Sequence, residues 1–181
     1  PSLAGGATLT PVAVGAGATL SPGNAGSPLG RMTLLGDLNF KPGSAYRVAT
    51  TADGQHSSVH VAGTANLAGS VVQLAQNGNY APSTTYAILT AGNGVQGRFD
   101  SVSSNLAFLT PSLSYDSNRV DLVVNLKEVP TDNGGGTRPI QFVDAAFTGN
   151  QRAVARALQS LSSGSALYQH VLNLPKNSPA A

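Results

Sequence analysis

The chain has 181 residues, of which 41% are hydrophobic and only 10% charged, with 21 glycines and a formal net charge of +2. Disordered chains combine low hydrophobicity with high net charge, so this composition excludes disorder and favours many short strands joined by tight turns. Lys and Arg form no run. We therefore find no electrostatic footprint for nucleic acid or for an anionic membrane, and expect no nucleic-acid partner.

The chain contains no Cys. This excludes disulfides, thiolate metal sites and cysteine nucleophiles. A reducing cytosol and an export route that disfavours cross-links both explain the absence, so composition leaves the compartment open. No stretch approaches the roughly 20 apolar residues of a membrane-spanning helix.

Turn signals recur along the first half of the chain. An apolar residue, a spacer and a proline recur at Leu9-Thr10-Pro11, Leu20-Ser21-Pro22-Gly23 and Phe40-Lys41-Pro42-Gly43. Residues 39–54 and 79–94 also share one pattern, 40 positions apart. Self-similarity at such periods is typical of a solenoid, and we predict coils on a multiple of about 20 residues.

The 40-residue repeat matches aromatic residues with one another. It aligns Phe40 with Tyr80 and Tyr46 with Tyr86. In a solenoid such residues occupy equivalent inward slots, so we expect Tyr46 and Tyr86 to lie two coils apart in one stack. Period-2 alternation between and beyond them predicts short strands with one buried face.

A β-hairpin is predicted next. Leu113 and Tyr115 alternate up to the polar turn 116–118, and Leu122 belongs to the alternating strand that returns. A stack of coils needs a terminal cap, and we assign the hairpin to it. Large side chains crowd this region, so we expect residues 63–127 to be a stable nucleus onto which the N-terminal coils add. The residues expected to carry this structural role are Phe40, Tyr46, Tyr80, Tyr86, Phe99, Phe108, Tyr115 and Leu122.

The carboxyl-terminal part changes period from 2 to 3.6. Residues 131–139 are rich in glycine and predict a flexible linker. Thr148 and Gln151 form a T-x-x-Q capping box, and a first helix runs from there to Gly164. A second runs from Ser165 to Leu174 and ends before proline. The first helix carries an apolar stripe expected to dock on the β-structure: Val154, Leu158 and Leu161.

The predicted organisation is all-β with a helical appendage. The expected segments are β-helix coils (1–62), a capping module (63–130), a linker (131–139), a helical segment (140–175) and a tail (176–181).

Motifs that carry chemistry are weak. His56 and His60 are four apart, a zinc-binding spacing on helices, but they lie in a strand region without a nearby carboxylate. The segment Gly36-Asp37-Leu38-Asn39 places leucine where a GDSL-type lipase has its nucleophile, and no G-x-S-x-G elbow occurs. We therefore predict no catalytic residue, no metal site and no cofactor.

Several of these motifs follow one another in a familiar order. Four segments occur in this order along the chain: LSPGNAGSPLGRMTLLGDLNFKPGSAYRV, VAGTANLAGSVVQL, YAPSTTYAILTAGNGVQGRFDSV and LSYDSNRVDLVV. The succession resembles the C-terminal passenger, or autochaperone (junction) region, of classical Gram-negative autotransporters. The resemblance implies a right-handed parallel β-helix of a few coils, a hairpin cap, and a place at the bacterial cell surface or in the medium after cleavage.

The resemblance also implies a function and partners. The module would nucleate β-helix folding during secretion across the outer membrane and link the surface-exposed passenger to its translocator. Its partners would be its own C-terminal β-barrel translocator, upstream passenger coils and outer-membrane assembly machinery. An alternative is an adhesin-type surface of a virulence-associated protein that binds a host-cell or glycan ligand. The helical stripe has two interpretations of its own: it packs on the β-helix, or the helices approach the lumen or the periplasmic mouth of the barrel.

Overall fold

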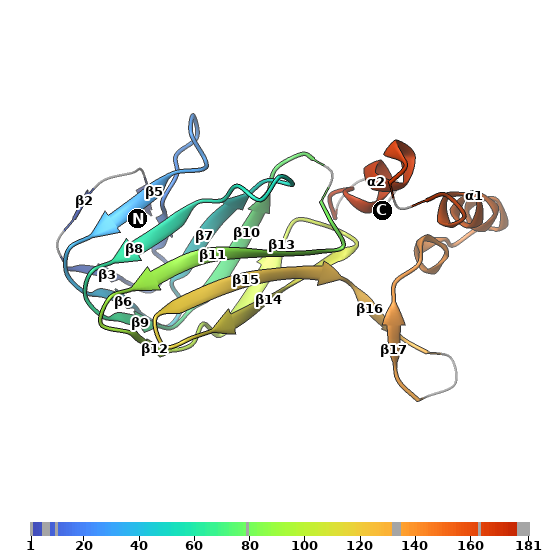
Figure 1. Cartoon of the computed structure of the whole chain (residues 1–181). Helices are drawn as coiled ribbons and strands as arrows, with labels where there is room; N and C mark the ends of the chain where they lie inside the picture. The colour runs from blue at the N-terminus through green and yellow to red at the C-terminus, as the bar shows by residue number, and fades with distance from the viewer. Residues whose placement is uncertain are drawn as a thin grey trace.

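The computed structural model describes residues 2–4, 8–9, 11–78, 80–131, 135–162 and 164–176. Within these residues the chain winds through three sheets with parallel pairing, and each lap contributes one strand to every sheet (Figure 1). An antiparallel hairpin closes one of the sheets, and a segment with two α-helices follows. The predicted fold is confirmed: a parallel β-helix with a hairpin cap and a short C-terminal helical appendage.

The sheets are distinguished by their strand order. The first has the order β1-β4-β7-β10-β13, the second begins β2-β5-β8-β11, and the third has the order β3-β6-β9-β12. The strands of the laps are Ser2–Ala4 (β1), Thr8–Leu9 (β2), Val12–Val14 (β3), Thr19–Ser21 (β4), Arg31–Leu34 (β5), Leu38–Phe40 (β6), Ala45–Thr50 (β7), Ser58–Val61 (β8), Ala65–Leu67 (β9), Ser70–Ala75 (β10), Ser83–Ala91 (β11), Val95–Gly97 (β12) and Ser101–Ser104 (β13).

The laps from β7 to β10 and from β10 to β13 are longer than predicted. In the first sheet Ala45 pairs with Ser70 and Ser70 with Ser101, which are separations of 25 and 31 residues. The predicted multiple of about 20 residues is therefore wrong. As a consequence Tyr46 lies in β7 of the first sheet and Tyr86 in β11 of the second, so the two tyrosines do not occupy equivalent slots.

The repeat misleads because one turn chemistry serves different corners of the coil. The Pro22-Gly23 turn follows β4 of the first sheet, whereas the Pro42-Gly43 turn follows β6 of the third. Phe40 likewise lies in β6, while Tyr80 lies in the corner between β10 and β11. A proline–glycine signal marks a corner without indicating which corner it is.

Apolar side chains stack in rows inside the coil. One row of the second sheet runs from Met32 in β5 through Val59 in β8 and Leu89 in β11 to Val120 in the cap. Each of the four is at most 1% exposed. Full burial of one such side chain contributes about 1.5–3 kcal/mol, so every lap adds stability only by stacking on its neighbours.

The predicted hairpin is confirmed as β14 (Leu109–Tyr115) and β15 (Arg119–Leu126). β15 pairs antiparallel with β11, and β14 pairs antiparallel with β15, so the second sheet ends in the order β11-β15-β14. The later strand is thus inserted between two earlier ones. Leu122 lies opposite both Tyr86 and Leu113 and is fully buried.

The segment after the cap contains β16 (Glu128–Pro130), β17 (Thr137–Pro139), the 3-10 helix η1 (Phe142–Ala145), α1 (Gly149–Gln159) and α2 (Ala166–Leu172). β16 and β17 pair antiparallel. Residues 137–139, predicted as linker, are therefore a strand, stabilised by the Thr137 hydroxyl, which donates to the Glu128 carboxylate at 2.5 Å. Residues 132–134 of that linker and 177–181 of the predicted tail lie outside the described residues.

The helices begin where the sequence predicts. Thr148 caps α1, with its hydroxyl accepting from the Gln151 amide and the Gln151 side chain accepting from the Thr148 amide. Ser165 caps α2 by accepting from the Tyr168 amide. The sequence predicted neither η1 nor the β16–β17 pair.

Candidate functional site

Two buried tyrosines connect the first and second sheets across the core. Tyr46 in β7 donates its hydroxyl to the carbonyl of Ile88 in β11 at 2.5 Å. Tyr86 in β11 donates in the opposite direction to the carbonyl of Thr51, just after β7, at 2.8 Å. Each hydrogen bond to an otherwise buried carbonyl contributes about 0.5–1.5 kcal/mol. The pair fastens the lap that carries the cap to the lap before it.

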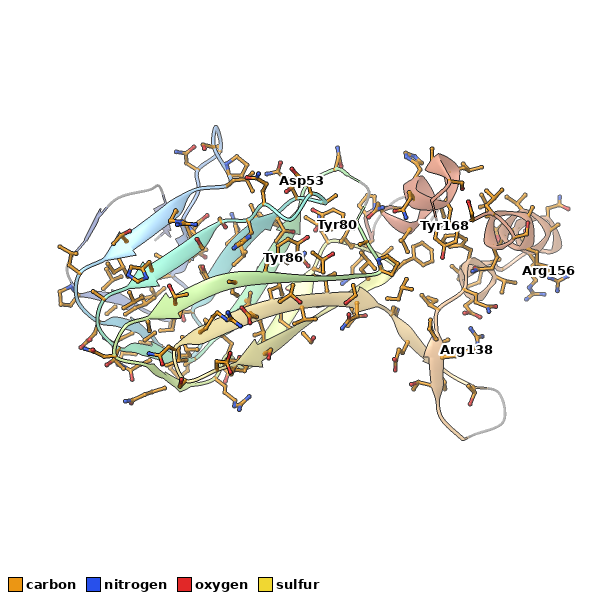
Figure 2. The ribbon with its side chains drawn as sticks, in the orientation of Figure 1. Asp53, Tyr80, Tyr86, Arg138, Arg156 and Tyr168 are labelled. Carbon is orange, nitrogen blue, oxygen red and sulfur yellow. The ribbon has the colours of Figure 1, made fainter. Side chains whose placement is uncertain are left out.

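A third tyrosine joins this network from the corner before β11. Tyr80 donates to the carbonyl of Thr50 at 2.6 Å, and the Gln73 amide donates to the Thr50 hydroxyl at 2.9 Å. All three residues are fully buried, and Figure 2 shows Tyr80 beside Tyr86 in the side-chain view. The predicted residues Tyr46, Tyr80 and Tyr86 thus meet, although not by stacking in one column.

Burial raises the pKa of these three tyrosines. The pKa of Tyr86 rises to about 12, chiefly through burial and secondarily through the neighbouring Tyr80. The pKa values of Tyr46 and Tyr80 are also raised, again mainly by burial. The hydroxyls are therefore neutral donors at physiological pH, far from the range in which a general acid or base works best. The network can hold strands together, and its hydroxyls are not tuned for proton transfer.

A second aromatic cluster shares Tyr46 with this network. The ring of Phe40 in β6 lies 5.7 Å from Tyr46 and 5.2 Å from Phe99, centroid to centroid. The Phe99 amide donates to the Tyr115 hydroxyl at 3.1 Å, and the Arg98 guanidinium lies 4.6 Å from the centre of the Tyr115 ring. Aromatic pairs contribute about 0.5–1.5 kcal/mol beyond their buried area. The cluster joins β6, β7, the segment after β12, and the hairpin.

The hairpin turn is bound to the corner after β11. The Asn118 side-chain amide donates to the carbonyls of Ala91 and Gly92, at 2.9 and 3.2 Å. The backbone contributes too, because the Val95 amide donates to the Ser117 carbonyl at 2.8 Å. The cap is therefore held at its turn as well as along its strands.

The helical segment docks on the corner between the first and second sheets. The Ala107 amide donates to the Leu174 carbonyl at 3.1 Å, and the Tyr80 amide donates to the Asn173 side chain at 3.1 Å. Leu172 is 1% exposed. The segment after α2 thus returns to the cap and satisfies backbone groups that the corner leaves open.

A chain of rings continues from the cap into the helices. Phe108 lies 5.4 Å from Phe142 of η1, and Phe142 lies 4.9 Å from Tyr168 of α2, measured between centroids. The Phe142 amide donates to the Gln159 side chain of α1 at 2.9 Å. Phe108, predicted as a residue of the nucleus, is therefore the ring through which the β-helix contacts the aromatic residues of its appendage.

The predicted docking stripe of α1 is corrected in part. Val154 is 61% exposed and Leu161 lies at the surface, whereas Leu158 packs partly buried against the core. The buried residue of α1 is Ala155. The unpredicted η1 is the reason, because α1 packs mainly on η1, and Ala155 and Leu158 belong to or contact the core cluster that contains Phe142 of η1.

The asparagines of this site were missed from the sequence. Asn118 ends a polar turn, and Asn173 follows the last residue of α2, a position where asparagine often ends a helix. Both signals were available, but they indicate a turn and a helix end without indicating the long-range partner.

Two classes of site find no support in the described part of the chain. Residues of the described ranges contain no group of three or more His, Cys, Asp or Glu able to hold a metal ion. Neither α1 nor α2, nor any other helix among the described residues, has the length and apolar character needed to cross a membrane.

Comparison with known proteins adds a similarity at moderate identity. The chain is 28% identical over 153 residues to a protein named extracellular serine protease from Serratia marcescens, and 28% identical over 149 residues to a second protein of that name and organism. The matches cover 80% and 77% of this chain but 13% of each relative. No family model matches the chain.

The similarity and the fold point the same way. Both relatives are extracellular by name, which agrees with a secreted or surface location. Together with the β-helix, the similarity fits an autotransporter passenger region. The word protease describes the relatives, of which this chain spans about an eighth, so the predicted absence of catalysis stays a prediction here.

Proposed function

We propose that this chain is the folding and junction module of an autotransporter passenger. In this role it nucleates the β-helix during secretion across the outer membrane of a Gram-negative bacterium. It then links the surface-exposed passenger to its translocator. The fold and the similarity to extracellular proteins support the class of protein, and the architecture of the cap supports the folding role.

The observation that carries the proposal is the antiparallel hairpin inserted at the end of the second sheet. β14 and β15 are joined by a turn of three residues, 116–118. A hairpin forms within about 1–10 μs, whereas the parallel pairings of β10 with β7 and with β13 require closure of laps of 25 and 31 residues. The cap is therefore the element that can form before the laps do.

The contacts of the cap then give an order to the rest. β15 offers β11 a strand edge to pair with, and Asn118 fixes the corner after β11. Tyr46 and Tyr86 next fasten β7 to β11 across the core. The laps that precede β7 in the chain can then stack on an ordered surface. Contacts with this ordered neighbour offset the conformational entropy that each lap loses on folding.

Pulse-labelled hydrogen exchange during refolding of the 181-residue chain tests this order. We expect the amides of β11, β14 and β15 to be protected in the earliest phase and those of β4, β5 and β6 later. Protection of β4–β6 first, or of all six strands together, contradicts the proposal.

A further inference from the structure

The helical segment keeps an apolar surface open to solvent. Among the described residues, most of the large apolar side chains that remain exposed lie within residues 147–167. They are Phe147, Val154, Leu161 and Leu167. Phe147 is 84% exposed, although a residue just before a helix cap usually packs on the helix's first turn; here the facing position is Arg152, so no apolar partner is present.

Phe147 and Val154 are among the residues that line an apolar groove. The groove has a volume of about 560 Å³ and lies between η1, α1 and α2, with Phe142, Leu158 and Val171 in its lining. Its size is in the range of sites that hold apolar ligands. Phe147, Val154 and the groove therefore form one surface, which we call the helical apolar face.

The charge of the segment complements this face. From residue 145 to the last residue the sequence contains Arg152, Arg156 and Lys176 and no Asp or Glu. In the described part of the chain neither Arg152 nor Arg156 forms a salt bridge. The two arginines are one turn apart on the side of α1 opposite Val154, and Arg156 lies on the far side of the segment from the β-helix (Figure 2).

We propose that the helical apolar face docks on an anionic lipid surface. A helix with apolar residues on one side, arginines on the other and no acidic residue is the pattern that lies in the interfacial plane of a bilayer. Long arginine side chains reach the headgroup level while their stems remain in apolar surroundings. Although the whole sequence shows no basic run, folding gathers the charge and the apolar side chains on one segment.

The same charges disfavour a second copy as the occupant. Two copies meeting through Phe147 and Val154 would combine four unpaired arginines in one assembly, with no carboxylate from residues 145–176 to offset their charge, which disfavours association. An anionic bilayer supplies the missing negative charge and the apolar phase at once. The proposal concerns the helical segment and does not rest on the folding role of the cap.

A single tryptophan tests the docking, because the chain contains none. Phe147→Trp places the probe at the helical apolar face, and Leu35→Trp places a matched control at an exposed leucine, 62% accessible, after β5. With vesicles of phosphatidylcholine and phosphatidylglycerol at 3:1, we expect the emission of F147W to shift to the blue and to resist acrylamide quenching. The emission of L35W should not change.

Charge variants and lipid composition complete the test. R152Q/R156Q, in the F147W background, should lower vesicle partitioning roughly 10- to 30-fold, and 0.5 M salt should weaken the binding of F147W itself. Pure phosphatidylcholine should bind much less. Equal binding to both vesicle types, an equal shift in L35W, or no shift in F147W overturns the proposal. A concentration-dependent dimer that needs F147 and forms without lipid overturns it in favour of a second copy.

Discussion

The amino-terminal laps and the capped half of this β-helix share one winding and differ in what holds them. β3, β4, β5 and β6 are three or four residues long and pair only in parallel. β11, β14 and β15 are nine, seven and eight residues long and pair antiparallel in the cap. No aromatic residue precedes Phe40, and the tyrosine network begins at β7.

The difference teaches that a uniform topology does not imply uniform stability. A parallel lap gains only from its neighbours, whereas the hairpin also has local contacts that form fast. The carboxyl-terminal half therefore has the means to fold as a unit, and the amino-terminal laps depend on it. Four predictions, which use six substitutions, test this contrast.

The largest effect is expected from two matched leucines of the second sheet. Leu122 in β15 and Leu34 in β5 are both fully buried, so replacing either with alanine should lower the free energy of unfolding by about 2–5 kcal/mol. If the cap nucleates folding, L122A slows folding, while L34A mainly accelerates unfolding. Folding and unfolding rates measured against denaturant distinguish the two. If L34A slows folding as much as L122A does, the two halves of the β-helix do not differ in their part in nucleation.

Replacing a glycine with alanine should also destabilise the protein more at Gly97, in the capped half, than at Gly43, in the amino-terminal laps. Gly43 and Gly97 have φ of +77° and +72°, so alanine is strained at both by about 1 kcal/mol. A Cβ at Gly97 would lie 2.6 Å from the Leu67 carbonyl oxygen, whereas at Gly43 its nearest neighbour, the Ala16 side chain, is 3.7 Å away. We expect G97A to cost about 3 kcal/mol in total and G43A about 1, measured by equilibrium unfolding. Equal losses of stability in G97A and G43A would mean that the backbone around Gly97 moves to accommodate the added Cβ at little cost.

The tyrosine network predicts a loss of stability at alkaline pH. The pKa of Tyr86 is about 12 when folded and about 10 when unfolded, so its contribution is complete below pH 10 and is lost between pH 10 and 12. Over that window the free energy of unfolding falls by about 1.4 kcal/mol per pH unit for each such tyrosine. Tyr86→Phe should cost about 1 kcal/mol at pH 7 and make this fall less steep. If the free energy of unfolding of Y86F falls as steeply between pH 10 and 12 as that of the unmodified protein, groups other than Tyr86 cause the fall.

The smallest effect is expected in the appendage. Arg138 contacts Asp144 at 2.8 Å through both guanidinium nitrogens, and this hydrogen bonding lowers the pKa of the Asp144 carboxyl. The stabilisation is present above the unfolded pKa near 4 and is lost as the pH falls below it. Asp144→Asn should cost at most about 1 kcal/mol. Hydrogen exchange should become faster around η1 and remain unchanged in β11 and β15; a change in those strands would show that the appendage and the cap unfold together.

The sequence was sufficient for the features whose signals are local. The hairpin followed from alternation on both sides of a polar turn, and the start of α1 followed from Thr148 and Gln151. The β-helix itself was reached through the resemblance and the repeated turn signals.

The features that the sequence missed depend on contacts between distant residues. The lap length is set by pairings such as Ala45 with Ser70, which a repeated Pro-Gly turn does not determine. Tyr46 and Tyr86 lie on different sheets and each donates a hydrogen bond across the core to the other sheet. The sequence repeat had predicted that they occupy equivalent positions in one stack. Val154 is exposed because η1, which lacks a periodic signal, takes up the docking position of α1.

The position of β15 has a consequence for how the stack ends. Because β15 lies between β11 and β14, winding in chain order leaves β11 with an open edge until the last strand of the sheet has been made. The outer strand β14 then carries Pro111, which has no amide hydrogen to offer a further strand. The second sheet therefore cannot easily be extended beyond β14. At its other end, the edge of β2 can pair with a further strand. Additional laps, or a strand from another molecule, should pair with β2 more readily than with β14.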